Sequence, residues 1–218
     1  MTATLFKYVR ARHLKDILEH GRFRLGTLYE YRDIEEHGQA IGDADEGKHR
    51  TAFTSANRTD FNLQDGSQAA QFFRGHITPD NHLAGIRRMV LLPGTKVIAE
   101  AQAPDMFVFC ASTIFDKALM VEFGYDACIR IEAPHRFFSA ISHAIRHQAR
   151  FVTFSEVVYR DRETSHLNPH TIHPALMKGL DYSRQAEVRA LWEPLRENIQ
   201  PLFVSCRKAA GYCSMVRS

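Results

Sequence analysis

The chain has 218 residues, of which 44% are hydrophobic and 24% are charged, and its formal net charge is +3. This composition suits one globular domain with a real core, and the mild charge permits a nucleic acid or an anionic cofactor without requiring either. No apolar run approaches the roughly 20 residues of a membrane span, and no signal core opens the chain. We therefore expect a cytoplasmic protein with no membrane partner.

The first half of the sequence predicts short strands separated by one helix and polar loops. Leu5–Val9 is apolar and aromatic, as in a strand, and residues 11–20 have helical spacing up to Gly21. Extended or turn segments follow over 23–31, and the acidic residues Asp43, Asp45 and Glu46 lie in a loop that we expect to be solvated. We predict further strands at 90–92, 97–99 and 106–110, of which the last is apolar enough to be central.

The second half continues this pattern. We predict helices at 114–123, 137–150 and 174–179, and strands at 127–131, 151–159 and 203–206. Many short strands with segregated helices favour an α+β fold with mixed or antiparallel sheets, in a single domain over 1–218. Neither GxGxxG nor GxxxxGK[ST] is present, so the sequence encodes no Rossmann or P-loop phosphate cradle.

The segment 182–192 carries the strongest functional signal. If it is a strand, Gln185 and Glu187 project from one face, because side chains at i and i+2 share a face. An amide and a carboxylate side by side can hold a sugar and orient a nucleophile. The alternative is an amphipathic helix, since Ala186, Glu187, Arg189 and Leu191 are good helix formers.

Three segments in this order resemble the ADP-ribosyltransferase superfamily. They are Lys7-Tyr8 with the pattern Ile-Leu-Glu-His-Gly at 17–21, then Phe109-Cys110-Ala111-Ser112, and last Gln185-Ala186-Glu187. The opening is similar to bacterial members that modify nucleic acids, such as DNA- and mRNA-targeting toxins, and residues 23–47 resemble small uncharacterised bacterial proteins. The resemblance implies a split core of mixed or antiparallel sheets flanked by helices, with NAD as a substrate.

The resemblance also implies catalytic residues. Glu187 would accept from a ribose hydroxyl and stabilise an oxocarbenium-like transition state, while Gln185 would orient the acceptor. Ser112 would fix the cleft wall by bonding to Glu187 or the ribose. The middle motif is Cys-Ala-Ser, where the family has Ser-Thr-Ser.

Binding residues follow from the same comparison. Lys7, Tyr8 and Arg10 are alternatives for the NAD clamp, and Tyr29 and Tyr31 are candidates to stack on nicotinamide or a target base. Core packing is the alternative for these tyrosines. Arg32 would contact a phosphate, and we place Arg189 with it among the residues that bind the acceptor.

The resulting expectation is a NAD-dependent ADP-ribosyltransferase of bacterial toxin or phage-defence type. Its acceptor would be a nucleic acid, RNA or DNA, in preference to a protein, and an antitoxin protein would be a partner. One alternative is a non-catalytic regulatory module on the same fold. The other is a metal-dependent nuclease built on the acidic loop with His166, His170 and His173, although we expect no metal because Pro169 and Pro174 interrupt any helix that could align them.

Overall fold

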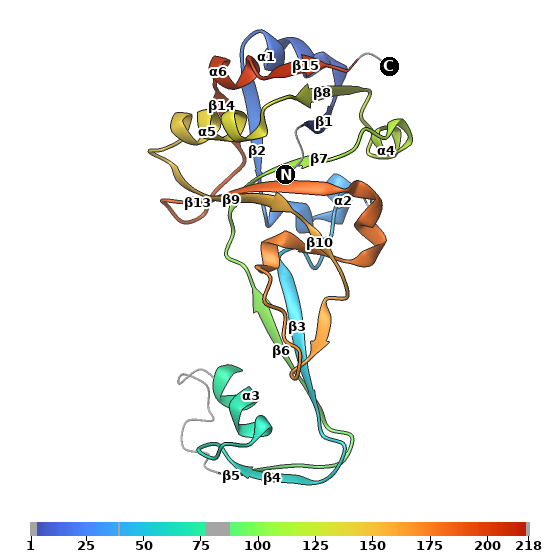
Figure 1. Cartoon of the computed structure of the whole chain (residues 1–218), viewed down its shortest axis with the longest axis vertical. Coiled ribbons are helices and arrows are strands. Elements are labelled where there is room, and N and C mark those ends of the chain that lie inside the picture. The colour runs from blue at the N-terminus through green and yellow to red at the C-terminus, as the bar shows by residue number, and fades with distance from the viewer. Residues whose placement is uncertain (1–3, 39, 77–87, 217–218) are drawn as a thin grey trace. The chain divides into compact units, whose positions relative to one another are not determined.

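The computed structural model describes residues 4–38, 40–76 and 88–216, and it has few helices and mostly antiparallel sheets (Figure 1). The predicted mixture of helices with mixed or antiparallel sheets is confirmed at this level. Contacts within the chain form two compact units. Unit 1 comprises 1–47, 103–160 and 173–218, and unit 2 comprises 48–102 and 161–172. That 1–218 is one ADP-ribosyltransferase-like domain stays a prediction.

Unit 1 contains the large sheet and most of the helices. Its strands are β1 (Leu5–Val9), β2 (Arg22–Thr27), β7 (Phe107–Ser112), β8 (Ala127–Ile131), β9 (Ala149–Glu156), β10 (Val158–Tyr159), β12 (Met177–Lys178), β13 (Glu187–Pro194), β14 (Leu202–Ser205) and β15 (Cys213–Met215). Its α-helices are α1 (Leu14–Leu18), α2 (Ile34–His37), α4 (Lys117–Glu122), α5 (Pro134–Ala144) and α6 (Arg207–Ala210). Short 3-10 helices cover Ala11–His13, Glu30–Arg32, Pro174–Leu176 and Leu180–Gln185.

The large sheet has the order β14-β2-β7-β1-β8-β15, and β13 pairs with both β7 and β9. One edge of β7 pairs with β13 along its whole length, from Phe107 to Ser112. On the other edge, β2 pairs only with Phe107 and Val108, and β1 pairs only with Ser112. Residues 109–111 therefore have no strand partner on that edge within the described part of the chain. The sheet splits at this point.

The alternation of β13 explains how unit 1 forms its core. Val188, Ala190 and Trp192 face one side and pack in the main hydrophobic cluster, which also takes Phe137 and Ile141 from α5. Burying large side chains of this kind contributes about 1.5–3 kcal/mol each. The opposite face of β13 carries Glu187 and Arg189. This face borders the split in the sheet.

Unit 2 is built around a smaller sheet and one helix. β3 (Lys48–Thr54), β6 (Lys96–Gln102) and β11 (Glu163–Ser165) form one sheet, and β4 (Thr59–Asn62) pairs with β5 (Arg88–Leu91). The helix α3 (Gln68–His76), which the sequence analysis did not predict, adds Phe72 and Phe73 to a cluster with Phe53 and Phe61. Unit 2 thus has apolar contacts of its own.

Several predicted elements are corrected by the structure. The helix predicted over 174–179 ends at Leu176, and Lys178 belongs to the strand β12. The helix predicted to Arg150 ends at Ala144, because Ala149 already pairs in β9. The segment 187–194 is a strand, so its helical alternative is wrong. Gln185, however, ends a 3-10 helix and does not belong to that strand.

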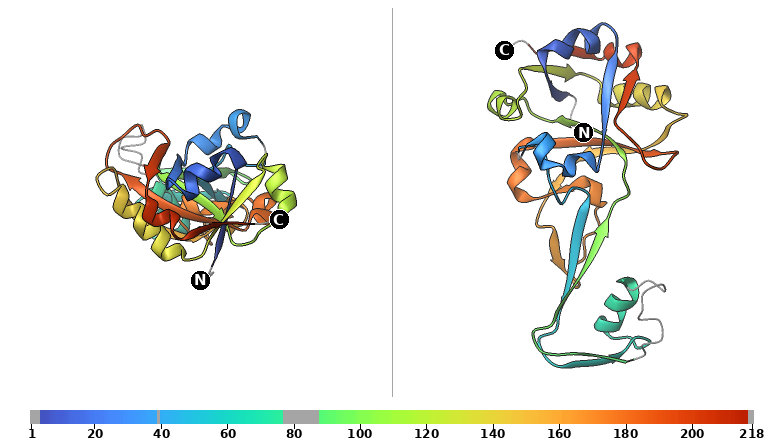
Figure 2. Two further views of the ribbon diagram at one scale, coloured as in Figure 1. Left: turned by 90° about the horizontal axis from the view of Figure 1, so that it is seen from above. Right: turned by 180° about the vertical axis from the view of Figure 1, so that it is seen from behind.

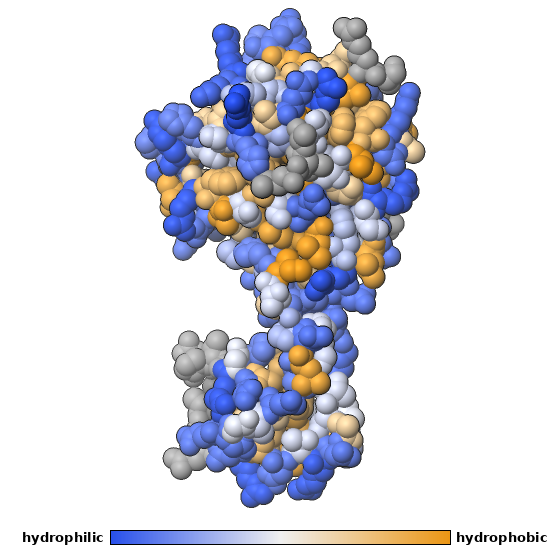
Figure 3. All heavy atoms as spheres, in the orientation of Figure 1, coloured by the Kyte–Doolittle hydropathy of each residue, from blue (hydrophilic) through white to orange (hydrophobic). Residues whose placement is uncertain are grey.

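The views from above and behind show α5 and α6 beside the sheet of unit 1 (Figure 2). In the face shown in Figure 3, hydrophilic residues cover much of the surface of each unit, and apolar residues form smaller groups among these hydrophilic residues. This mixture is usual for a folded chain. Within the described residues, no helix combines the length and the apolar character that crossing a membrane requires.

Candidate functional site

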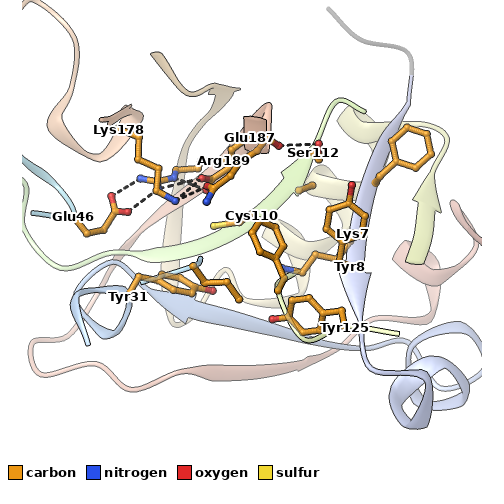
Figure 4. Close-up of a pocket in the computed structure, with 15 residues that line it drawn as sticks. Lys7, Tyr8, Tyr31, Glu46, Cys110, Ser112, Tyr125, Lys178, Glu187 and Arg189 are labelled. Atoms are coloured by element: carbon orange, nitrogen blue, oxygen red, sulfur yellow. Dashed lines mark hydrogen bonds and ion pairs between the residues drawn. The ribbon is translucent and has the colours of Figure 1, made fainter. Parts of the chain in front are cut away.

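A cavity of about 80 Å³ opens in unit 1 where the sheet splits (Figure 4). Its walls come from β1, β7, β13 and the segments next to them. The lining residues are Phe6, Lys7, Tyr8, Tyr31, Ile41, Glu46, Cys110, Ala111, Ser112, Phe123, Tyr125, Lys178, Gln185, Glu187 and Arg189. Residues from the beginning, middle and end of the chain thus meet in one hollow.

Most of the residues predicted for the site lie around this cavity. Those that line it are Lys7, Tyr8, Tyr31, Ser112, Gln185, Glu187 and Arg189. Arg10, Tyr29 and Arg32 are not among the lining residues. Three segments that are far apart in the sequence therefore lie around one cavity.

Glu187 belongs to a buried network of charges on one side of the cavity. Arg189 donates from Nε to Oε1 of Glu187 over 2.7 Å, and from Nη1 and Nη2 to both carboxylate oxygens of Glu46 over 2.6 and 2.8 Å. It also donates to the carbonyl oxygen of Ala175 over 2.7 Å. The Arg189 side chain is only 2% exposed. Arg189 is therefore a partner of Glu187, and its predicted role in acceptor binding stays a prediction.

Glu46 corrects the expectation of a solvated acidic loop. Its side chain is 1% exposed, and Asp43 is also buried. The loop lies inside because Glu46 balances the guanidinium of Arg189, to which it forms a paired contact through both oxygens. A buried guanidinium needs such a partner, since an uncompensated charge in a protein interior is very costly.

Lys178 is the second cation of the network. Its ammonium donates to Oε1 of Gln185 over 2.7 Å and to Oε2 of Glu187 over 3.1 Å, and it lies 4.8 Å from the ring centre of Tyr182. With Glu46 and Arg189, these side chains form a set of two carboxylates and two cations. The network as a whole is therefore electrically neutral.

Burial and charge act in opposite directions on Glu187. Burial alone would raise the pKa of its carboxyl, but the charges of Arg189 and Lys178 outweigh burial and hold that pKa well below its usual range. For Arg189, burial would lower the pKa, and the carboxylates of Glu187 and Glu46 raise it well above its ordinary value. The two cations thus favour the ionised form of Glu187.

Gln185 and Glu187 do come together, though by a route different from the one predicted. Ala186 between them has φ of 42° in the left-handed region and ends the 3-10 helix. This conformation turns the chain between a helical residue and the first residue of β13. Nε2 of Gln185 donates to the carbonyl oxygen of Ala40 over 2.8 Å, so both ends of the amide contact the protein.

Ser112 lies opposite Glu187 in the register of β7 and β13. Its hydroxyl donates to the carbonyl oxygen of Gln185 over 2.9 Å and accepts from the backbone N–H of Ile114. Ser112 therefore joins β7 to the backbone of Gln185 at the wall of the cavity. The predicted bond to the Glu187 carboxylate is not the one that forms.

The three candidates for the NAD clamp differ in their surroundings. The Tyr8 hydroxyl donates to the carbonyl oxygen of Ile114 and accepts from the backbone N–H of Asp116, so it holds the chain after β7 in place. Lys7 lines the cavity with its ammonium 5.0 Å from the ring centre of Phe109. Arg10 is exposed and lines a surface hollow that shares Tyr125 with the cavity.

Aromatic side chains form much of the remaining wall. Phe6, Tyr8, Tyr31, Phe123 and Tyr125 line the cavity. Tyr29 instead donates its hydroxyl to the carbonyl oxygen of Ala103, and Arg32 stacks on its ring at 3.7 Å.

Cys110 lies between the two sides of the cavity (Figure 4). Burial, and then the negative charge of Glu187, raise the pKa of its thiol to about 12. Cys128 and Cys213 also have raised pKa values, and all four cysteines are free thiols. A thiol with so high a pKa is a poor nucleophile at neutral pH.

The residues of the nuclease alternative do not form a cluster of metal ligands in the described part of the chain. In the parts of the chain that the structure describes, no three His, Cys, Asp or Glu side chains are grouped so that they could hold a metal ion. His173 accepts from the backbone N–H of Ala175 and begins a 3-10 helix, whereas His166 packs against the ring of Phe53 in unit 2. The nuclease alternative has no assembled site in this structure.

Two members of the network, Lys178 and Glu46, were not predicted as site residues. Lys178 lies in a segment predicted to be helical, and no local pattern indicates that it is buried. Glu46 was considered as a metal ligand and set aside as solvated. Arg189 and Glu46 are 143 residues apart in the chain, so their pairing is visible only in the folded structure.

Comparisons with known proteins give no family for this chain. It matches no protein-family model, no curated protein and no solved structure.

Proposed function

We propose that this chain is a NAD-dependent ADP-ribosyltransferase of toxin or phage-defence type that transfers ADP-ribose to a nucleic acid. The observation that carries the proposal is the position of Glu187. Its buried carboxylate has a lowered pKa, which favours the ionised form, and it lines the cavity. Lys7 and Ser112, from the other two segments of the resemblance, line the same cavity.

The chemistry requires a carboxylate at this place. Cleavage of the bond between ribose and nicotinamide gives a transition state that resembles an oxocarbenium ion. A fixed negative charge in a site that excludes water stabilises the positive charge that develops. The nicotinamide ring of NAD is flat and cationic, and aromatic rings with a nearby carboxylate favour such a group.

The size of the cavity suits the reactive end of the dinucleotide. About 80 Å³ is below the 300–1,000 Å³ typical of a whole ligand pocket, so the remainder of NAD would lie along the open surface. The hollow that shares Tyr125 carries Arg10 and Lys117. These cations would face the diphosphate, with Lys7 closer to the sugar and the ring.

The experiment that tests the proposal follows the transfer of a label. Purified protein is incubated with NAD labelled in its adenylate half, together with separate pools of RNA, DNA and cell protein. We expect the label in a nucleic acid pool and equimolar release of nicotinamide. NADH serves as a control ligand, because its reduced ring is uncharged and is a poor leaving group.

The matched variants are Glu187→Gln and Glu193→Gln, both on β13. Glu187→Gln keeps the shape of the side chain and removes its charge, whereas Glu193 is paired with Arg150 at the surface. We expect Glu187→Gln to lower nicotinamide release by at least about 100-fold, the usual effect of losing one group that stabilises transition-state charge. Glu193→Gln should stay near wild type. Equal rates for the two variants would refute a catalytic role for Glu187.

A second function is favoured by one specific observation. Both oxygens of Glu187 already accept from Arg189 and Lys178, and Gln185 is bonded at both ends, so the network is complete without a ligand. This arrangement suits a regulatory module that keeps the fold and does not turn over NAD. NAD at 100 times its dissociation constant adds about 2.7 kcal/mol of stability to a protein that binds it. The absence of a thermal shift across millimolar NAD would favour the module.

A further inference from the structure

We propose that Lys178 is a positioning residue, which locks Gln185 and Glu187 side by side and thereby sets the geometry of the reactive carboxylate. The proposal rests on the function proposed above for its effect on turnover. Its structural part, the fixing of Glu187, can be measured with no ligand at all.

Three residues, of which Lys178 lies on β12, Tyr159 on β10 and Val157 just before β10, hold Glu187. β12 pairs in parallel with β10, with Tyr159 opposite Lys178. The Tyr159 hydroxyl accepts from the backbone N–H of Glu187 over 2.7 Å. The backbone N–H of Val157 donates to the carbonyl oxygen of Glu187 over 2.9 Å. Lys178 holds the side chain. Val157, Tyr159 and Lys178 therefore hold both the backbone and the carboxylate of Glu187.

A lysine at this position also matches the orientation of Gln185. Because its ammonium can only donate, it selects the carbonyl oxygen of the amide, Oε1. The amide nitrogen must then face the carbonyl oxygen of Ala40. The carbonyl oxygen of Ala40 can only accept, so both contacts select the same orientation and the amide is held at both ends. Lys178 thus joins two side chains that belong to different elements.

A lysine that is buried in this way needs partners for its charge. The Lys178 side chain is 5% exposed, and its ammonium contacts Gln185, Glu187 and the ring of Tyr182. A buried ammonium is stable only when it is paired and hydrogen-bonded. Reactive groups must be held within about 0.5 Å of the productive geometry, and the second partners that do so commonly contribute 10- to 100-fold to activity. Arg189 fixes Oε1 of Glu187, and Lys178 fixes Oε2.

The test compares Lys178→Met, which keeps the length of the side chain and removes its charge, with Lys178→Arg, which keeps the charge. Lys15→Met, at an exposed position of the helix α1, is the matched control. We expect Lys178→Met to lower kcat for nicotinamide release by about 10- to 100-fold while KM for NAD changes by less than about threefold. Lys178→Arg should recover part of the loss, and Lys15→Met should behave as wild type.

The second measurement needs no substrate. In protein with ¹³C-labelled glutamate carboxyls, the Glu187 signal is assigned by its loss in Glu187→Gln, and its titration is followed in wild type and in Lys178→Met. We expect the pKa of Glu187 to rise in Lys178→Met, and the acid limb of kcat to move to higher pH with it. If the titration of Glu187 and kcat per folded molecule are both unchanged in Lys178→Met, the proposal is overturned.

The two proposals fail in different ways. If wild type releases no nicotinamide, the transferase is refuted, and the carboxyl titration alone decides whether Lys178 positions Glu187. Should Lys178→Met fail to fold, Lys178→Arg and Gln185→Leu replace it. Gln185→Leu, which removes the amide that Lys178 contacts, should then lower kcat while Lys178→Arg retains most of it. A Gln185→Leu protein with wild-type kcat would contradict the positioning of that amide.

Discussion

At the scale of single residues, the site depends on a buried carboxylate, that of Glu187, which contacts two cations. Glu187 contacts Arg189 at 2.7 Å and Lys178 at 3.1 Å, and the partners outweigh the effect of burial on its pKa. Removing one member of such a buried set is expected to cost about 3–5 kcal/mol, since it leaves an uncompensated charge. A change of Glu187 to alanine would therefore combine loss of function with loss of stability, and glutamine is the better test.

The lowered pKa of Glu187 predicts how stability depends on pH. In the unfolded chain a glutamate has a pKa of about 4.3, and in the folded protein the pKa of Glu187 lies below that value. The stabilisation is therefore complete above the unfolded pKa and is lost as pH falls toward the folded pKa. Urea unfolding between pH 7 and pH 3 should show a steeper acid loss in wild type than in Glu187→Gln. Parallel curves would mean that Glu187 is not an ionised, paired residue.

The raised pKa of Cys110 predicts an unreactive thiol beside the carboxylate. With a pKa of about 12, caused first by burial and then by Glu187, only about one thiol in 10,000 is ionised at pH 8. Mass spectrometry after brief iodoacetamide treatment should find Cys110 unmodified in folded protein and modified in urea. Cys110→Ala should retain nicotinamide release within about threefold. Rapid labelling of Cys110 in the folded state would show that the cavity walls are not packed as described.

At the scale of elements, the sequence predicted strands better than it predicted their ends. Of the two alternatives left open for 182–192, the strand is confirmed over 187–194, where Val188, Ala190 and Trp192 form one apolar face with the period of two of a strand. The prediction that Gln185 lies on the same strand as Glu187 was wrong, because Gln185 ends a 3-10 helix. Nothing in the local sequence indicates that Ala186 adopts a left-handed conformation, which is held by its carbonyl bond to the backbone N–H of Thr113.

This conformation of Ala186 leads to a prediction about the turn. A left-handed φ costs a residue with a Cβ about 1–2 kcal/mol, and glycine avoids this cost but loses about 0.5–1 kcal/mol in chain entropy. Ala186→Gly should therefore be near neutral in urea unfolding. Ala186→Val should be destabilised by more than about 1 kcal/mol and should lower nicotinamide release, because β-branched residues fit this region poorly.

Asn198 provides the control for this prediction. It also has a positive φ, of 54°, but it lies in the connection after β13 and does not line the cavity. Asn198→Val should lose stability without a change in release per folded molecule. If Ala186→Val were as stable and as active as wild type, the turn would not be what brings Gln185 next to Glu187.

At the scale of the whole molecule, the fold class followed from the sequence, and the cavity did not. Residues 106–110 were predicted as a central strand, and β7 does pair with β13, β2 and β1. That β1 and β2 leave residues 109–111 unpaired on one edge depends on pairings between distant segments. Likewise, the burial of Lys178 depends on its contacts with Gln185, Glu187 and Tyr182, which the sequence around Lys178 does not indicate.

The division into two units predicts that the site is insensitive to the core of unit 2. The whole cavity is lined by residues of unit 1, whereas Phe73 is buried in the cluster of unit 2 with Phe53, Phe61 and Phe72. Truncation of a buried phenylalanine to alanine costs about 3–5 kcal/mol. Phe73→Ala should accelerate amide exchange in β3, β4 and α3 and leave the protection of β7 and β13 unchanged, as expected for separate cooperative units.

The matched change in unit 1 is Phe137→Ala, because Phe137 is fully buried in the main cluster beside β7. It should accelerate exchange in β7 and β13 and lower nicotinamide release, whereas Phe73→Ala should leave release per folded molecule near wild type. Exchange measured by mass spectrometry on peptides from each unit gives both results at once. If Phe73→Ala instead increased exchange equally in β13 and α3, the chain would unfold as one cooperative body, and the structure around Glu187 would depend on residues far outside its cavity.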